Sequence, residues 1–345
     1  MDKKTVIILG LSMVIIILAV IVGLVFLRGE EDTWLCQNGE WVKHGNPVSP
    51  MPITGCGNTA IANPASAFCL KQGGNSTIKT NPNGGEYGVC FFSDGSACEE
   101  WSYFRNECQP GKNISVFYPF AGGEVNLPFK VEGIARVFES VVSFRLKDGN
   151  GDVLFSSTAM AQSPDLGQFG AFTKEINYLT KTPTSTDVVL EVYQASAKDG
   201  SDTDKISVPL KLNLGDTTKL KIYFNNTKLD PAMTCNKVFP VDRVVAKTET
   251  PAKAALELLL AGELTQDEAQ AGYETNINPG VKLQKVTIVS GTAKADFDEQ
   301  LEYQVGGSCR VAAISAQIIQ TLKQFSTVKK VIISINGRTE DILQP

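Results

Sequence analysis

Four carboxylates near the C-terminus are the side chains best placed for acid–base chemistry: Asp296, Asp298, Glu299 and Glu302. Enzymes that cleave glycosidic bonds use two carboxyl groups that face each other across a cleft. These four begin where a strand is predicted to end, and Asp298 is in position to cap the turn that follows. The spacing therefore favours capping or surface roles, with a binding surface and a glycan-cleaving site as alternatives.

The eight cysteines provide a second candidate chemistry. All follow an apolar N-terminal run and their number is even, so an oxidising compartment would pair them as disulfides. They contain no C-x2-C pair, and His44 is the only histidine, which disfavours zinc and leaves some free thiols as the alternative. The candidate disulfide cysteines are Cys36, Cys56, Cys69, Cys90, Cys98, Cys108, Cys235 and Cys309.

Two cysteine spacings have particular consequences. Cys36 and Cys56 could close a small loop on itself. Cys235 and Cys309 are the last two in the chain, and a bond between them would close a loop of about 75 residues, worth roughly 4.5 kcal/mol in the chain-entropy model.

Other catalytic and ligand-binding patterns are missing from the sequence. The single histidine lies in a segment rich in Pro and Gly, which argues against a Ser-His-Asp or Cys-His site. Neither G-x-x-x-x-G-K-[ST] nor a G-x-G-x-x-G after a strand occurs, so nucleotide binding lacks its phosphate cradle. The net charge of −5 and the absence of a basic stripe argue against nucleic acid. We predict no enzyme activity, cofactor or metal.

Two acidic loops invite a calcium interpretation. Residues 148–152 begin like an EF-hand loop, but Val153 and Ala159 replace the glycine and the bidentate glutamate that this loop requires. The same residues are typical of a hairpin turn. Residues 199–204 are predicted to form a solvated loop, with a weak cation site as the alternative.

Residues 5–27 carry no charge and at ~1.5 Å per residue would span roughly 34 Å, enough to cross a bilayer. Lys3 and Lys4 precede them, so the positive-inside rule places residues 1–4 in the cytoplasm and 28–345 outside. The run is long for a signal peptide and lacks an Ala-x-Ala site. We therefore predict a single-pass cell-membrane protein with extracellular or periplasmic domains; a cleaved signal and a lipoprotein are the alternatives.

The outer part is too long for one core, so several domains are expected. Residues 28–62 form a tether with a cysteine loop, in which Asn38-Gly39 predicts a turn between two short strands. Residues 63–110 form a small disulfide-rich α+β module: a helix capped by Asn63, a hairpin, and a second helix that carries Cys98 and Cys108. Within the second helix, Glu99-Glu100 is either a paired-carboxylate site or, more simply, a solvated first turn.

This module resembles a small bacterial cysteine-rich domain that bears a hemolysin label. The segments that carry the resemblance are Asn63-Pro64-Ala65 ahead of Cys69, Gly73-Gly74, Gly88-Val89-Cys90, Asp94-Gly95, and Cys98-Glu99-Glu100-Trp101 ahead of Cys108. The label implies little about activity, because the segment lacks a membrane-active apolar face. A secreted toxin or inhibitor would require release from the anchor.

Residues 112–213 are rich in β-forming residues and contain no cysteine. Strands are predicted at residues 114–118, 124–132, 141–147, 152–157, 169–176, 188–195 and 205–212. Such short strands without helical periodicity predict an antiparallel sandwich. The region resembles the immunoglobulin-like domain of bacterial spore-germination proteins at Pro119, Pro128-Phe129, Val131-Glu132-Gly133, Ala135, Phe138-Glu139, the turn at 148–151, Phe169 and Phe172.

Residues 217–345 combine strands and helices. Strands are predicted at 218–225, 281–289, 292–297 and 328–336, and helices at 250–260 and 311–325. The segment resembles the GerMN domain of sporulation and germination proteins. The matching residues are 220–224, Ala255-Leu256, Leu259, Gly262, Ile277-Asn278-Pro279-Gly280, Ala293, Asp296-Phe297, Gln317-Ile318, Leu322, Val331 and Asn336-Gly337.

The sequence thus predicts a multidomain chain: an N-terminal transmembrane helix, a small disulfide-rich α+β module, an all-β immunoglobulin-like sandwich and a C-terminal α+β GerMN-like domain. The resemblances imply a non-enzymatic envelope protein that binds or scaffolds partners outside the membrane. Envelope proteins or peptidoglycan are the expected partners. The alternative is an envelope enzyme or glycan-binding protein that uses the carboxylates at 296–302.

Overall fold

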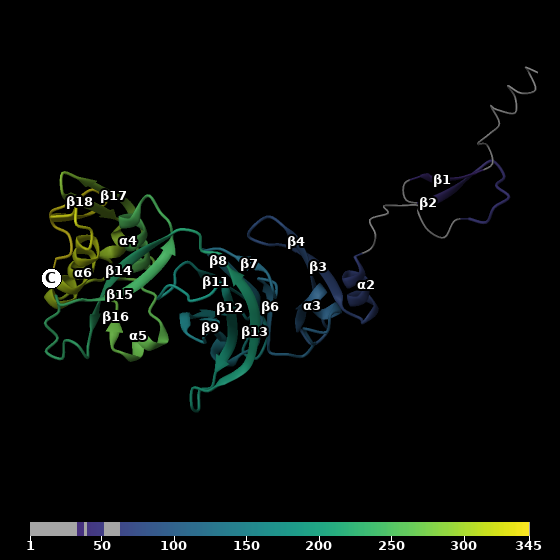
Figure 1. Ribbon diagram of the computed structural model, residues 1–345, viewed down its shortest axis with the longest axis horizontal. Helices are drawn as coiled ribbons and strands as arrows, with labels where there is room; N and C mark the ends of the chain where they lie inside the picture. Colours follow the sequence, from purple (N-terminus) through teal and green to yellow (C-terminus); the bar gives the residue numbers. More distant parts are fainter. Residues whose placement is uncertain (1–32, 38–39, 52–62, 345) are drawn as a thin grey trace, which may run out of the picture. The chain divides into compact units, whose positions relative to one another are not determined.

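The computed structural model describes residues 33–37, 40–51 and 63–344 (Figure 1). Residues 1–67 and 68–345 form two compact units, and each is described by itself. The predicted anchor at 5–27 and Cys56 lie outside the described residues, as does the side chain of Cys36. Within the described part of the chain, no helix is both long and apolar enough to cross a membrane.

In the first unit, the two strands predicted around Asn38-Gly39 are present. β1 (Thr33–Gln37) and β2 (Glu40–His44) pair antiparallel, with Trp34 opposite Lys43. The Trp34 indole donates to the Ser49 carbonyl at 2.9 Å. His44 ends β2 and is exposed.

Helix α2 (Pro64–Lys71) spans the boundary between the units and opens the cysteine-rich module. β3 (Asn75–Thr80), β4 (Glu86–Phe91) and β5 (Ala97–Glu99) follow as an antiparallel sheet, and the short helix α3 (Glu100–Phe104) packs on it. The predicted second helix is therefore too long, because Cys98 lies in β5 and Cys108 lies beyond α3. Disulfides join Cys69 to Cys90 and Cys98 to Cys108.

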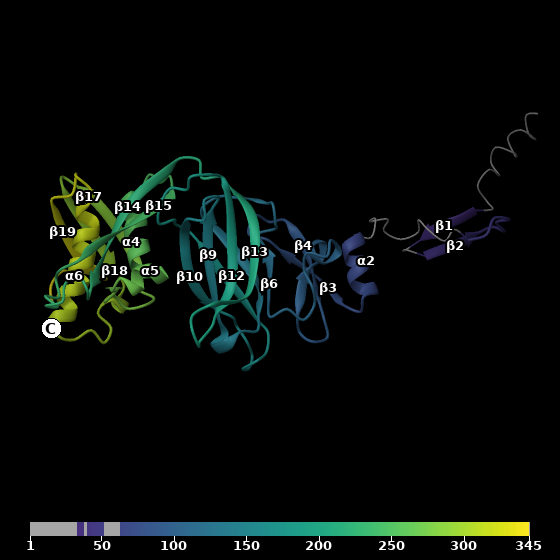
Figure 2. The same cartoon turned by 60° about the horizontal axis from the view of Figure 1, so that its bottom comes forward.

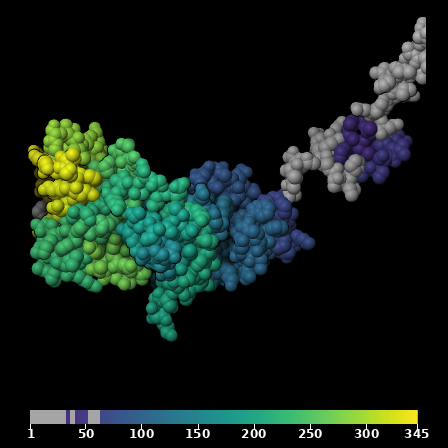
Figure 3. Space-filling view, in the orientation of Figure 1, coloured from purple at the N-terminus to yellow at the C-terminus, as the bar shows by residue number. Residues whose placement is uncertain are grey.

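The sandwich has two sheets, in the strand orders β10-β9-β12-β13-β7 and β11-β8-β6. Its strands are β6 (Ile114–Tyr118), β7 (Glu124–Val125), β8 (Phe129–Ala135), β9 (Val141–Asp148), β10 (Val153–Met160), β11 (Gly170–Ile176), β12 (Asp187–Ala195) and β13 (Asp202–Leu212). The single strand predicted at 124–132 is two strands in different sheets. Pro128 lies between them and offers no N–H to a ladder, so the chain leaves one sheet there and enters the other. Figure 3 shows the connection between β12 and β13 projecting from the sandwich surface.

The C-terminal domain has two three-stranded sheets, β15-β14-β16 and β17-β18-β19. Helices α4 and α6 contact each other and β14; α4 also contacts β17, and α6 contacts β19 (Figure 2). The elements are β14 (Thr217–Asn226), β15 (Phe239–Ala246), α4 (Pro251–Ala261), α5 (Gln266–Gln270), β16 (Tyr273–Glu274), β17 (Leu283–Val289), β18 (Thr292–Phe297), α6 (Ser308–Lys323) and β19 (Lys330–Ile335).

The apolar stripes of α4 and α6 form the centre of this domain. Leu256 and Leu259 of α4 and Ile314 and Ile318 of α6 are fully buried. Gly262, in the left-handed conformation, ends α4 as the sequence predicts. The apolar core continues without a break from this domain into the sandwich.

Candidate functional site

The four carboxylates, for which a binding surface was the alternative to capping or surface roles, lie near the ends of β18 and β19. Each bonds there to the protein itself. The Asp296 carboxylate accepts hydrogen bonds from the Ser334 hydroxyl at 2.6 Å and from the Gly337 N–H at 2.9 Å. Glu299 accepts from the Asn336 amide at 3.0 Å, which holds the pKa of the Glu299 carboxyl below its usual range. These bonds hold the turn that follows β19.

The other two carboxylates of the cluster are also engaged. Asp298 precedes the 3-10 turn Glu299–Leu301 but makes no capping bond to it, contrary to the sequence prediction. Its carboxylate accepts from the Lys282 N–H at 3.0 Å, and its own N–H donates to the Lys282 carbonyl, so it extends the β17–β18 ladder. Glu302 accepts from Arg338 at 2.5 Å and from the Leu343 N–H at 3.3 Å.

This arrangement has a clear chemical consequence. A glycosidase requires one protonated and one ionised carboxyl group facing a substrate cleft. Here the four side chains bind backbone amides, a hydroxyl, an amide side chain and a guanidinium of the same domain. The geometry is that of a cluster that stabilises the β18–β19 end of the domain.

Glu99 and Glu100 do not form a solvated helical turn; both are buried. The Glu99 carboxylate caps α3 by accepting from the N–H groups of Trp101 and Ser102, at 3.0 and 2.7 Å. A β-carbon at Gly88 would come within 2.0 Å of a Glu100 carboxylate oxygen, so the bare glycine makes room for that side chain. The prediction of solvent exposure was wrong because β4 covers this turn.

The acidic loops of the sandwich are local turns. Asp148 accepts from the N–H groups of Asn150 and Asp152 and from the Thr184 hydroxyl at 2.7 Å. The Thr184 hydrogen bonds are the main reason that the pKa of Asp148 lies below its usual value. In the projecting loop, Asp199 accepts from the Ser201 hydroxyl. Among the described residues, no group of three His, Cys, Asp or Glu side chains is arranged to hold a metal ion.

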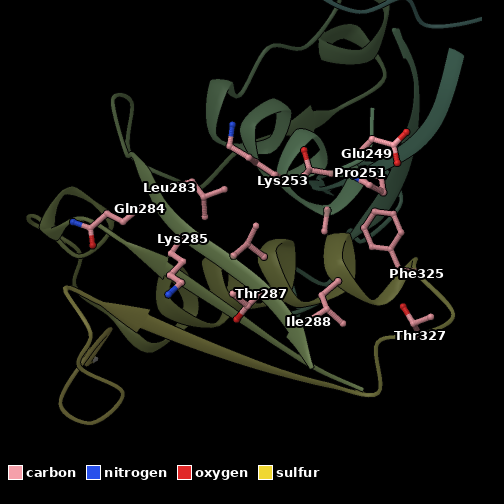
Figure 4. Close-up of a pocket in the computed structure, with 13 residues that line it drawn as sticks. Glu249, Pro251, Lys253, Leu283, Gln284, Lys285, Thr287, Ile288, Phe325 and Thr327 are labelled. Carbon is pink, nitrogen blue, oxygen red and sulfur yellow. The ribbon is translucent and has the colours of Figure 1, made fainter. Parts of the chain in front are cut away.

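A groove of about 400 Å³ between α4 and β17 is the strongest candidate for a binding site (Figure 4). Three segments line it: residues 249–253 at the start of α4, residues 283–288 of β17, and Phe325 with Thr327. Its apolar side chains are Pro251, Ala252, Leu283, Val286, Ile288 and Phe325. Glu249, Lys253 and Lys285 also line it and carry both signs of charge.

The strand that forms one wall of this groove is an edge strand. β17 pairs on one side with β18, and its other side pairs with no described strand. Ile288 and Val289, at its end, are 38% and 68% exposed. An open strand edge beside an apolar groove is suited to an added strand, whose backbone bonds to the edge while alternate side chains enter the groove.

Sequence reasoning missed this groove, although it located β17. The available signal for the groove was the pair Ile288-Val289, directly before the Ser290-Gly291 turn. These two apolar side chains lie on opposite faces of an edge strand. The sequence does not show which side of β17 is covered by α4, because α4 begins some thirty residues earlier in the chain. That contact forms only in the tertiary fold.

Comparisons with known proteins agree with the three resemblances. Residues 60–107 match the family model "Domain of unknown function (DUF333)", and residues 113–201 match "Immunoglobulin-like domain of bacterial spore germination". Residues 221–341 match the model named Germane, "Sporulation and spore germination". A comparison with curated proteins finds no match.

Two solved structures are similar to part of this chain. The tandem GerMN domains of the sporulation protein GerM from Bacillus subtilis are 25% identical with a TM-score of 0.28, over 36% of this chain and 41% of that one. The first GerMN domain of the same protein is also 25% identical with a TM-score of 0.28, over 35% of this chain and 85% of that one. The chain thus spans less than half of the tandem structure. In order, it carries segments similar to DUF333, to the spore-germination immunoglobulin-like domain and to the Germane family.

Proposed function

We propose that the protein is a non-enzymatic cell-envelope protein of the sporulation- and germination-associated type, which binds protein partners outside the membrane. Residues 5–27 would anchor it, with the N-terminus in the cytoplasm and the domains in the extracellular or periplasmic space. The family matches support the association with sporulation and germination. The open edge of β17 beside the apolar groove is the observation that carries the binding role.

The groove favours an extended polypeptide over a wall glycan as its occupant. Its lining is mostly apolar, whereas a glycan requires many hydroxyl-binding polar groups. A bound strand would satisfy its backbone on β17 and place apolar side chains against Pro251, Val286 and Phe325. Lys285 on the edge, and the bulge between Leu283 and Lys285, would limit unspecific strand pairing.

Photo-crosslinking in cells tests this proposal. A photoreactive amino acid would replace Ile288 in the groove or, as the matched control, Tyr303, which lies near the acidic cluster and is 57% exposed. We expect discrete protein adducts from position 288 and few from 303. Adducts with wall glycan at 303, with none at 288, would contradict the proposal and favour the glycan alternative.

A second pair of variants tests the same surface without a probe. Ile288→Asp places an unpaired charge in the apolar groove and should abolish copurification of the crosslinked partner. Tyr303→Asp adds the same charge outside the groove and should leave copurification unchanged. Equal losses in both variants would show that the groove is not the contact.

A further inference from the structure

The disulfides of residues 68–345 differ in their exposure to solvent. Both cysteines of the Cys69–Cys90 bond are completely buried, whereas the Cys98–Cys108 bond joins a completely buried cysteine to a partly exposed one. Cys235 is partly exposed and Cys309 is exposed, so the Cys235–Cys309 bond can be reached by a reagent in solution. Thiol–disulfide exchange requires a thiolate to approach a sulfur atom directly, so access controls its rate.

The exposed disulfide joins two elements that are distant in the sequence. Cys235 lies in the connection between β14 and β15, residues 227–238, and Cys309 is the second residue of α6. Met233 and Cys235 both adopt left-handed backbone conformations, with φ of 46° and 66°. These conformations are unfavourable for residues with a β-carbon, so this connection depends on its surroundings to keep its shape.

Few other interactions hold the second half of this connection. The Asn225 amide donates to the carbonyls of Cys235 and Lys237, at 2.8 and 3.1 Å. Asp230 accepts from the N–H and hydroxyl of Thr234, but both residues belong to the connection itself. The disulfide is thus the one covalent bond between this segment and α6 in the described structure.

A small cavity of about 80 Å³ lies at the disulfide. Both cysteines line it, together with Asn225, Glu274 and Asn276. The side-chain oxygen Oδ1 of Asn225 accepts from the side-chain amides of Asn276 and Gln317, at 3.0 and 2.7 Å. Movement of the connection would therefore widen access to this cavity and to the Asn225 side chain in it, which is 8% exposed.

We propose that Cys235–Cys309 is a site of reversible reduction by an envelope dithiol, and that its redox state controls the connection and the cavity at its base. A thiolate of the dithiol attacks the Cys235 sulfur, and Cys309 leaves as a thiolate. That thiolate lies at the N-terminus of a 16-residue helix, where negative charge is favourable. The second thiol of the partner then displaces Cys235. The dithiol loses two electrons and two protons and becomes a disulfide, and the two cysteines become thiols.

Graded reduction of the full chain tests the first half of this proposal. The protein would be incubated with increasing dithiothreitol, alkylated, and analysed by mass spectrometry for each cysteine. We expect Cys235 and Cys309 to react at least about tenfold faster than Cys69 and Cys90, because the latter sulfurs are accessible only after local unfolding. Equal rates for the two pairs would overturn the proposal.

Hydrogen exchange tests the second half. After reduction of the exposed disulfide, amides in residues 227–238 should exchange at least about tenfold faster, and those of β3 and β4 should not change. A Cys235→Ser/Cys309→Ser variant should show the faster exchange without reductant and no further response to it. Unchanged exchange at 227–238 in the reduced wild type would show that the bond controls nothing there. Neither outcome depends on the groove beside β17.

Discussion

The sandwich meets its two neighbours in different ways. At its junction with the C-terminal domain, Arg243 of β15 is only 2% exposed and donates to both carboxylate oxygens of Glu268, at 2.6 and 2.8 Å. Its guanidinium lies 4.5 Å from the centre of the Tyr178 ring, and Lys174 pairs with Glu263 at 2.7 Å. The backbones of Leu179 and Val244 exchange two hydrogen bonds across the same junction.

The junction with the cysteine-rich module is mainly apolar and aromatic. Tyr87 and Val89 of β4 form a separate small core with Phe117 and Ile134 of the sandwich. Phe91 packs edge-on against Phe117, with ring centres 6.5 Å apart. Side-chain hydrogen bonds also cross this junction, from the Tyr87 hydroxyl to Glu132 at 3.2 Å and from the Asn83 amide to the Tyr118 hydroxyl at 3.3 Å.

The two junctions hold neighbouring domains in place by different kinds of interaction. A buried charged network is directional: its members stabilise one orientation and penalise others, because any shift leaves a buried charge without a partner. Aromatic packing depends mainly on buried area and tolerates small rearrangements. We therefore expect the C-terminal junction to be the more rigid and the less tolerant of mutation.

Arg243→Met should produce the largest effect. The variant leaves the partly buried Glu268 without its cation and removes the stack on Tyr178, so we expect a loss of about 3 kcal/mol in the free energy of unfolding. Calorimetry should show the sandwich and the C-terminal domain unfolding separately. The double variant Arg243→Met/Glu268→Leu should regain most of the loss. Because Glu268 also forms the capping box of α5 with Thr265, the single variant Glu268→Leu is the control. A double variant less stable than both single variants would show that packing, rather than the charge pair, defines this junction.

Phe117→Ala should have the next largest effect. It removes the central ring of the smaller core, and we expect a loss of about 3 kcal/mol confined to the cysteine-rich module and the strands that touch it. Limited proteolysis would locate the loss. Phe138→Ala, at a side chain 61% exposed, is the matched control and should change stability by less than about 0.5 kcal/mol. Global unfolding of the chain by Phe117→Ala would contradict a separate core.

Tyr87→Phe should lower the free energy of unfolding by a smaller amount, about 0.5–1.5 kcal/mol. The variant removes the hydrogen bond to Glu132 and keeps the aromatic ring. Chemical denaturation monitored by the fluorescence of Trp101 in α3 would report it. A larger loss would mean that the Tyr87–Glu132 bond contributes more to this junction than its aromatic packing does.

The smallest expected effect is on the free energy of unfolding at alkaline pH. Burial raises the pKa of both Tyr87 and Tyr178 above the ordinary value of about 10. The folded state thus favours the neutral phenol, so this stabilisation is complete below about pH 10 and is lost as the pH rises further. Tyr178→Phe should weaken the alkaline loss of stability while changing stability at neutral pH by only a few tenths of a kcal/mol. An unchanged alkaline slope in this variant would show that Tyr178 does not contribute.

Much of the secondary structure could be predicted from the sequence. The strands expected at 114–118 and 292–297 have those limits as β6 and β18. The apolar stripe around Ile314 and Ile318 predicted α6. In contrast, β15 was missed, because Pro240 and the polar pair Asp242-Arg243 interrupt the alternation expected of a strand.

The site was less predictable than the elements. The sequence places Asp296, Asp298, Glu299 and Glu302 close together, but their hydrogen-bond partners, among them Lys282, Ser334, Asn336 and Arg338, come from other segments. A local pattern cannot show whether a carboxylate faces a cleft or a neighbouring backbone. The same holds for Glu99 and Glu100, which look like a solvated pair and are buried.

The kinds of elements and most of their order could be inferred from local patterns, because hydrophobic periodicity, turn residues and caps act within a few residues. The sequence also indicated that the cysteines form disulfides, and three are present among the described residues. The three-dimensional packing was needed to show how far each of these bonds is exposed, which edge of β17 stays open, and that Arg243 is buried between two domains. Each of these depends on segments that are distant in the chain, and burial and electrostatics are fixed only when those segments pack together.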